Sequence, residues 1–576
     1  PEFDFLWLAL FCRARKHVSC EQYDWSPLRR RVLTLVSYWL RLPIGGIGDK
    51  SFPSVSNPRS RSCPPRLRVF VGSISADGGM DFVAKIAKLL VANLGAGDGS
   101  SRSTGAIAIS EGSNDMLRFL SFVAPYFNPS NIGSWTLTLG AFLHYFSYEL
   151  CCRVGKQGGM DVLSNSNPDL AKAIRKRRPG ANPGPIPPHE LVAILDACLP
   201  LCQQALYSKN VHVGRAAEAS MVYLVQIDPV HTTPALLDFA TQALDVSAVN
   251  LAHQAPSALS ALARLVQPAL RSDPIILLAR LPTLLRLTLA GIDSNDQNKT
   301  IRTLIFYRSL TSWVPIGGAA LCWQREAALA TFDVHDGVMK FGDNLMRTLA
   351  ERRQSREYQD AVEALPEESL LRHHIVLETV RSPEIESVIL EEALSAMEDW
   401  ALEFLERVFE LLRASGERAK TSKSATGMAS RYSSSDVSQA RNFSRVLKEC
   451  LLQLFCSVDD EGHALLTRSV VRFLKEETLL TAAKDASLLC QAVAAVRISG
   501  AGTQESPGLD ALVVVLCDDL GHHSTKTCTY RIRCLAGAVR NAGMAVLKHR
   551  EALMEALEVC LSSDDRHLFK TGCKLL

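Results

Sequence analysis

The sequence predicts an all-α fold in which helical hairpins stack into a solenoid. Apolar residues recur at helical spacing along most of the chain, and no sustained alternation with a period of two residues favours a mainly β protein. Helical segments come in pairs joined by short turns, and the segments that open at Pro234 and Pro274 begin forty residues apart. The segment after Asn298 is apolar on two faces, which is typical of a helix packed between neighbours in a repeat stack. A hairpin unit of this period indicates HEAT-type repeats.

Composition narrows the protein class but not the function. Of the 576 residues, 47% are hydrophobic and 21% are charged, as expected for a folded intracellular chain, and the net charge of +3 gives no bulk signal for binding polyanions. The 16 cysteines include no C-x-x-C pair, so we expect small buried side chains in a reducing compartment. The apolar runs are too short to span a bilayer. Because the chain starts at Pro1 and stops within a helix-like pattern, we expect an internal fragment of a longer protein.

The most informative local pattern is a helical hairpin over residues 119–155. Pro125 disfavours α geometry at Ala124, so the first helix is predicted to end there. A turn follows, in which either Asn131 or Ser134 can cap the second helix. The apolar positions of that second helix recur at helical spacing: Trp135, Leu139, Phe142, Phe146 and Leu150.

Two regions interrupt the helical pattern in the first third of the chain. In residues 1–115, helical segments alternate with loops rich in glycine, proline and serine. Residues 156–188 cannot bury enough apolar area to fold, and we predict an exposed insertion. This insertion carries a basic run with two interpretations. It is functional, as a nuclear import signal or a patch for acidic partners, or it is a solvated loop without a function. Its cationic residues are Lys172, Arg175, Lys176, Arg177 and Arg178.

The rest of the chain is predicted to be helical with one further linker. Within 190–317, Pro234 and Pro274 are each expected in the first turn of a helix, where the missing N–H costs nothing. A long helical zone starts at Glu384, and Gly416 is expected to end it as a C-terminal cap. Residues 419–440 are expected to form a Ser/Lys-rich linker. Helical segments are then predicted at 443–455, 464–473, 482–496, 509–520, 531–546 and 552–561.

Motifs that carry chemistry are missing from the sequence. It contains no HExxH zinc motif, no GxSxG nucleophile elbow and no P-loop. The stretch from Asp293 to Asn298 starts like a calcium loop but lacks the central glycine and the closing glutamate, so we interpret it as a helix-capping turn. Adjacent histidines occur at 373–374 and at 522–523, but helical neighbours point about 100° apart and do not form a ready metal site. We predict no catalytic residue, no metal ligand and no cofactor site.

Three blocks resemble one family in order and spacing. The stretch Phe127 to Trp135 resembles the Phe-x-Pro-Ser-Asn-x-Gly-x-Trp signature of the giant HEAT-repeat proteasome activators, the bleomycin-sensitivity family. Leu289 to Thr300, and a third block around Trp400, are similar to two further segments of that family. The resemblance covers a middle HEAT-repeat region over residues 116–418, and it is weak over 1–115. The residues that carry it, to which we assign a structural role, are Phe127, Pro129, Ser130, Asn131, Gly133, Trp135, Gly291, Asp293, Asn295, Asp296 and Trp400.

The resemblance implies a function that the residues alone do not. Members of this family form an α-solenoid dome that binds the α-ring at the end of the 20S proteasome core particle. They open its gate without ATP, through a C-terminal tail that we expect outside this chain. They favour peptides and unfolded or acetylated substrates such as histones, act in nucleus and cytoplasm, and are linked to DNA repair. Inositol phosphates bind family members at basic openings, but we assign no residue here to that ligand. The alternatives are another HEAT-type scaffold, such as a nuclear transport carrier, and an enzyme with an unrecognised site.

Overall fold

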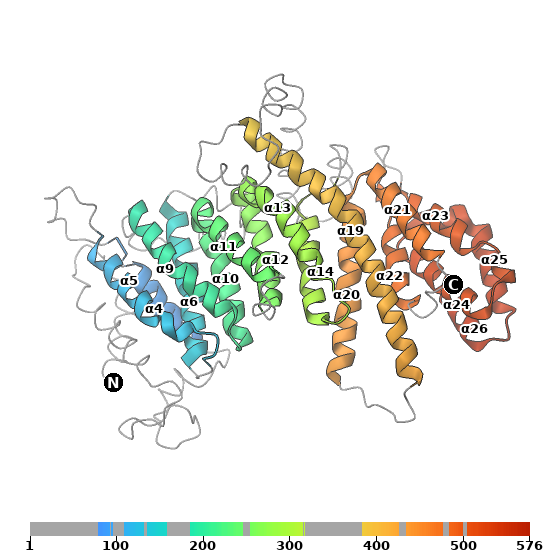
Figure 1. Cartoon of the computed structure of the whole chain (residues 1–576), viewed down its shortest axis with the longest axis horizontal. Helices are drawn as coiled ribbons and strands as arrows, with labels where there is room; N and C mark the ends of the chain where they lie inside the picture. Colours follow the sequence, from blue (N-terminus) through green and yellow to red (C-terminus); the bar gives the residue numbers. More distant parts are fainter. Residues whose placement is uncertain are drawn as a thin grey trace, which may run out of the picture. The chain divides into compact units, whose positions relative to one another are not determined.

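The computed structural model confirms a fold built from stacked pairs of helices (Figure 1). The structure describes residues 79–92, 94–95, 109–131, 135–157, 185–245, 254–314, 316, 383–424, 434–475, 483–498 and 504–575. Within these ranges the only β-strands are β1 (Arg497–Ile498) and β2 (Gln504–Glu505), which pair antiparallel as Arg497↔Glu505 and Ile498↔Gln504. No described helix combines the length and the apolar character needed to cross a membrane.

The chain divides into two units. The first comprises Pro1–Gln242 and Gln267–Pro274, and the second comprises Ala243–Val266 and Ile275–Leu576. The elements of the first unit are α4 (Gly79–Ala92), α5 (Glu111–Val123), the 3₁₀ turn η2 (Ala124–Phe127), α6 (Trp135–Gln157), α9 (Pro188–Leu206), α10 (Val211–Ile227) and most of α11 (Pro229–Leu244).

Helices of the first unit form two layers. Helix α6 packs between α4 and α10 in one layer, and α5 packs against α9 in the other. The core between them is aliphatic and aromatic: the ring of Phe142 meets Phe119 of α5 edge-on at 5.5 Å and stacks on Phe146 at 5.7 Å. The prediction of a hairpin over 119–155 is therefore confirmed, with Leu139, Phe142, Phe146 and Leu150 all buried.

The second unit is also built from two layers of helices. Its helices are part of α12 (Ala255–Ser272), α13 (Pro274–Leu289), α14 (Gln297–Thr311), α19 (Pro383–Ser424), α20 (Ser434–Ser457), α21 (Asp460–Leu474), α22 (Ala483–Val493), α23 (Pro507–Leu516), α24 (Thr525–Val539), α25 (Arg550–Leu561) and α26 (Arg566–Gly572), with 3₁₀ turns η5 (Leu520–His522) and η6 (Gly543–His549).

One layer of the second unit runs through α14, α20, α22, α24 and α26, each packed on the next, while α19, α21 and α23 follow one another in the other layer. Helix α14 meets α20 directly, although 122 residues, 312–433, separate the two helices along the chain. Past α14, Ile316 pairs with Val458 in a single parallel bridge, so the chain after α14 lies beside the α20–α21 turn. Two consecutive repeats therefore stack as neighbours across a long intervening segment.

Three helix boundaries differ from those predicted. Helix α13 does begin at Pro274, but Pro234 lies inside α11, because Asp228 accepts from the N–H of His231 and starts that helix a turn earlier. Gly416 does not end α19, which continues to Ser424, since a helix tolerates one glycine at a cost of about 1 kcal/mol. The helix predicted over 531–546 ends at Val539 and is followed by η6.

Other predictions meet the structure only in part. Helices α19 and α20 extend into the segment expected to be a linker over 419–440, of which 425–433 fall outside the described residues. The remaining predicted segments of the C-terminal region agree with α20, α21, α22, α23 and α25. The helical patterns predicted before residue 79, and those between 317 and 382, lie outside the described residues.

Candidate functional site

The first signature turn is held by its own side chains. Phe127 is buried at the end of η2, and Asn128 Oδ1 accepts from the backbone N–H of Ser130 at 3.0 Å and from its hydroxyl at 2.6 Å. The carbonyl oxygen of Pro129 accepts from the N–H of Lys209 at 3.5 Å, which ties the turn to the α9–α10 connection. These contacts give the turn a structural role.

Asn131 does not cap the following helix, which was one of two predicted possibilities. Its buried side-chain amide donates instead to the carbonyl oxygens of Pro125 (3.3 Å) and Tyr126 (3.1 Å), and so it caps the preceding turn η2. The predicted boundary at Ala124 is confirmed, but Ala124 keeps α geometry and the chain tightens into a 3₁₀ turn rather than leaving the helix. Gly133 and Ser134 lie outside the described residues, as does the side chain of Trp135, whose backbone starts α6.

The second signature turn, between α13 and α14, is a helix-capping turn, as predicted. Asp296 Oδ1 accepts from the N–H of Lys299 at 2.9 Å and caps α14. Asp293 Oδ1 accepts from the N–H of Asn295 at 2.8 Å. The hydroxyl of Thr300 donates to the Asp293 carbonyl oxygen and accepts from its N–H. The acidic side chains of this turn are therefore engaged with backbone donors, which suits capping rather than calcium binding.

Gly291 allows that turn to approach α14. A Cβ at this position would lie 2.2 Å from Thr303 Oγ1 and 2.9 Å from the carbonyl oxygen of Thr288. Only the first of these could move aside without a backbone shift. The glycine of the signature is therefore explained by a close approach between the turn and helix α14.

A buried chain of contacts joins the second signature turn to the third signature block. Thr288 donates to the Leu284 carbonyl oxygen at 2.7 Å, and its hydroxyl oxygen accepts from Tyr307 at 2.9 Å. The Tyr307 ring meets Trp400 of α19 edge-on at 4.7 Å, and Trp400 stacks on Phe404 at 5.2 Å. Burial raises the pKa of Tyr307 above its ordinary value. Tyr307 thus links Trp400 of the third signature block to Thr288, which directly precedes the second signature block in the sequence.

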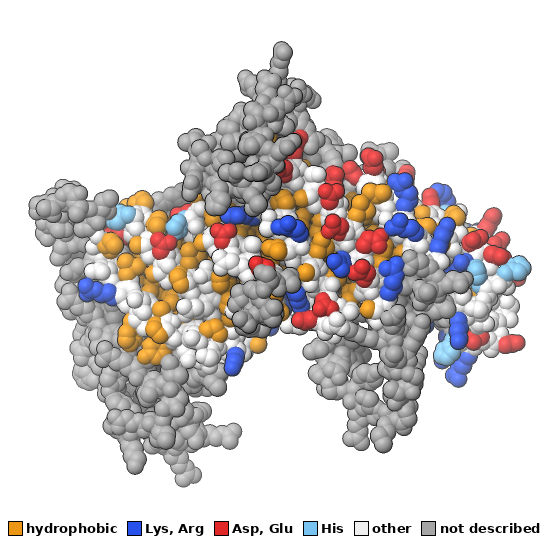
Figure 2. Space-filling view, viewed as in Figure 1, with side chains coloured by type: hydrophobic (Ala, Val, Ile, Leu, Met, Phe, Trp, Pro, Cys, Tyr) orange, Lys and Arg blue, Asp and Glu red, His pale blue; other side chains and the backbone are white. Residues whose placement is uncertain are grey.

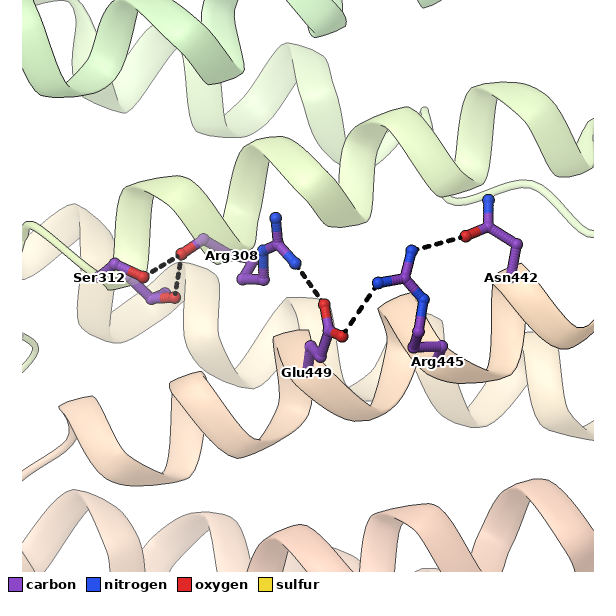
Figure 3. Close-up of polar contacts among 6 residues, drawn as sticks. Arg308, Ser312, Asn442, Arg445 and Glu449 are labelled. Carbon is purple, nitrogen blue, oxygen red and sulfur yellow. Dashed lines mark hydrogen bonds and ion pairs between the residues drawn. The ribbon is translucent and has the colours of Figure 1, made fainter.

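Figure 3 shows a second, more exposed link between α14 and α20. Arg308 pairs with Glu449, whose other carboxylate oxygen accepts from Arg445 at 3.4 Å, and Arg445 in turn donates to Asn442 at 3.0 Å. The Arg308 carbonyl oxygen accepts from the hydroxyl of Ser312 at 2.7 Å. Of these contacts, the Arg308–Glu449 pair joins the two helices that stack across the long intervening segment, and no local sequence pattern indicates it.

A buried carboxylate that no sequence motif indicates lies at the start of α9. Glu190, in the first turn of α9, accepts from the backbone N–H and the hydroxyl of Ser110, each at 2.8 Å, and from the hydroxyl of Ser113. Ser110 is itself the N-cap of α5. One acidic side chain therefore fixes the starts of two helices of the same layer.

The described residues show no assembly that resembles a metal centre, and every described cysteine is a free thiol. Burial raises the pKa of Cys198 and of Cys450 to about 12, so both side chains behave as buried apolar groups. His522 is exposed and pairs with Asp519, whereas His523 is partly buried. The basic run from Lys172 to Arg178 and the histidines at 373–374 lie outside the described residues.

Comparison with known proteins gives a family match. The sequence profile described as "Proteasome activator complex subunit 4, mid HEAT repeats region" matches residues 116–504, which is more than half of the chain. A curated relative, proteasome activator subunit 4 of Arabidopsis thaliana, is 24% identical over 209 residues. That alignment covers 34% of this chain and 10% of the Arabidopsis protein, so the chain matches a small part of its relative.

The similarities to solved structures add nothing to the family match. An engineered protein matches 88% of this chain and 97% of its own at 12% identity, with a TM-score of 0.19. Importin beta matches 86% of this chain and 82% of its own at 9% identity, with a TM-score of 0.16. Scores this low carry no argument about shape or function.

Proposed function

Because the chain belongs to the proteasome activator complex subunit 4 family, through its mid HEAT-repeat region, we propose that it is part of a regulatory cap on the 20S proteasome core particle. In this proposal the protein binds the α-ring at the end of the core particle and opens its gate without ATP. It has no catalytic residues of its own, and peptide bonds are cut inside the core particle. The observation that carries the proposal is the family match over residues 116–504.

The structure supports a role in binding. Stacked hairpins present a broad surface, because each repeat contacts only its neighbours. The signature side chains are occupied in capping turns and in packing α13, α14 and α19, as described above for Asn131, Asp296 and Trp400. Their chemistry is therefore used to hold repeats in register, which a binding scaffold requires.

The test is activation of latent core proteasome by the full-length protein. Hydrolysis of a fluorogenic peptide by the purified core particle is followed with and without the protein, each in the presence and absence of ATP. We expect stimulation that does not depend on ATP. A hydrolysis rate that stays at the latent level under all four conditions would count against a cap that opens the gate.

Substrates and localisation form a finer part of the proposal. We propose that peptides and unfolded or acetylated proteins, such as histones, are the preferred substrates, and that the protein works in nucleus and cytoplasm. The basic run Lys172, Arg175, Lys176, Arg177 and Arg178 would serve as the import signal. Replacing these five residues with alanine should shift a fluorescent fusion from the nucleus to the cytoplasm, whereas an unchanged distribution would remove this role from the run.

A HEAT-repeat scaffold or nuclear transport carrier is the alternative function. It would use the same two-layer fold but would bind cargo rather than proteasome. A carrier would associate with import cargo in pull-down experiments and would leave peptide hydrolysis by the core particle unchanged.

A further inference from the structure

The strongest unassigned surface lies near the C-terminal end of the second unit. Val514 on α23 and Met544 and Leu547 on η6 are 73%, 68% and 62% exposed, the three highest values for large apolar side chains among the described residues. Single exposed apolar residues are ordinary on protein surfaces, but grouped ones mark interaction sites. All three lie beyond residue 504, outside the part of the chain that the family profile matches.

The two elements that carry these three residues pack on each other, α23 on η6. Asp510 of α23 accepts from Lys548 Nζ at 2.5 Å and from His549 Nε2 at 2.6 Å, both at the end of η6. Val514 follows Asp510 by one helical turn, and Leu547 directly precedes Lys548. Burial would raise the pKa of Asp510, but the hydrogen bonds from Lys548 and His549 hold it below its ordinary value. The carboxylate thus fastens η6 to α23, the two elements that carry the exposed apolar side chains.

The geometry of η6 also points to an outward role. It is a 3₁₀ segment of seven residues, Gly543–His549, although such segments seldom exceed four residues. None of its residues is buried, although most are apolar. A segment of this kind gains little from the core of its own unit, so its apolar side chains are available to another surface.

An acidic row lies on α25, the helix that packs on η6. Glu551, Glu555 and Glu558 lie at i, i+4 and i+7 on α25, on one face of the helix, and all three are exposed. After burial, the charge of Glu555 is the next influence that raises the pKa of Cys517, the residue that follows α23. No described residue forms an ion pair with any of the three. Figure 2 shows acidic side chains gathered around the position of α25.

We propose that Val514, Met544 and Leu547, with the acidic row of α25, form a docking surface for a basic amphipathic helix of a partner protein. A helix with leucine-type residues on one face would cover the exposed apolar side chains, which is the usual way in which helices are recognised on such surfaces. Lysine or arginine residues beside that face would meet the three glutamates and select a basic partner over an acidic one.

The test measures binding of labelled synthetic helices to the full 576-residue chain by fluorescence anisotropy. The probes are an amphipathic leucine/lysine peptide, the same peptide with glutamate in place of lysine, and a scrambled leucine/lysine peptide without an apolar face. The amphipathic lysine peptide should bind best, and its affinity should fall as salt is raised from about 50 mM to about 500 mM, because exposed charge pairs are screened. The V514S/L547S variant should weaken its binding by about tenfold.

Two controls make the test decisive. Leu465→Ser removes a comparably apolar side chain, 41% exposed on α21, and should leave binding unchanged. E551Q/E555Q/E558Q should weaken binding of the lysine peptide and remove its salt dependence, while circular dichroism verifies that each variant keeps its helical content. Equal binding of the lysine and glutamate peptides, or equal weakening by Leu465→Ser, would overturn the proposal. Self-association of the chain that disappears in V514S/L547S would also overturn it, because a second copy would then be the occupant.

Discussion

The hydroxyl of Tyr307 on α14 donates a hydrogen bond of 2.9 Å to Thr288 Oγ1 on α13, and both side chains are fully buried. We expect Tyr307→Phe to lower the free energy of unfolding by about 1 kcal/mol, because a buried neutral hydrogen bond is lost while Thr288 keeps its own bond to Leu284. Urea denaturation followed by circular dichroism measures this change.

The matched control for that substitution is Tyr207→Phe in the first unit. The hydroxyl oxygen of Tyr207 is buried without a hydrogen-bond partner among the described residues. Removing it should leave stability unchanged or raise it slightly, because no bond is lost and a desolvated polar group disappears. An equal loss of unfolding free energy in Tyr307→Phe and Tyr207→Phe would contradict a stabilising role for the hydrogen bond between Tyr307 and Thr288.

Gly291→Ala should destabilise the second unit by about 2 kcal/mol. The added Cβ would lie 2.9 Å from the Thr288 carbonyl oxygen, so the backbone of α13 or of the turn has to shift. Gly521→Ala is the control, since no heavy atom lies within 4 Å of the corresponding position. The two midpoints of urea denaturation should therefore separate, and coincident midpoints would contradict the close approach seen at Gly291.

Asn131→Asp should cost about 2 kcal/mol although it barely changes the shape of the side chain. The carboxylate cannot donate to the carbonyl oxygens of Pro125 and Tyr126, and it places negative charge against them. Ser130→Ala removes an exposed hydrogen bond of the same turn and should cost less than about 0.5 kcal/mol. Hydrogen exchange of the amides at the end of α5 should rise in the aspartate variant alone.

The Arg308–Glu449 pair should couple α14 and α20 by about 0.5–1 kcal/mol, since both side chains are partly exposed and screened by solvent. A double-mutant cycle of Arg308→Ala and Glu449→Ala measures this coupling. The same cycle on Arg407 and Glu410, an exposed pair within α19, should give a smaller value. A coupling energy at Arg308 and Glu449 no larger than that of the exposed pair would mean that packing alone joins the two helices.

The sequence predicts the fold well because helical spacing is a local signal. The apolar positions of α6 recur at that spacing, and four of the five predicted positions are buried, the fifth being the undescribed side chain of Trp135. Boundaries were less predictable where several local preferences compete. Pro234 is expected to open a helix, but α11 begins about a turn earlier, where the Asp228 side chain caps it. The stabilisation from this cap outweighs the hydrogen bond that α11 loses because Pro234 has no N–H.

The contacts that join distant segments could not be predicted from one sequence. Nothing in the local pattern around Tyr307 or Arg308 indicates that their partners are Trp400 and Glu449, because such pairing depends on which helices stack. The signature residues were identified by resemblance, whereas their roles in capping turns required the structure. Asn131 illustrates the difference, since either neighbouring helical segment could have received its hydrogen bonds.

Sedimentation velocity of the labelled full-length protein with latent 20S core particle, without nucleotide, tests the proposed cap most directly. We expect the label to sediment with the core particle, in an amount that saturates as the protein is titrated. Label that sediments only at the rate of the free protein, at concentrations up to about 10 μM where a specific complex would be populated, would contradict binding to the core particle.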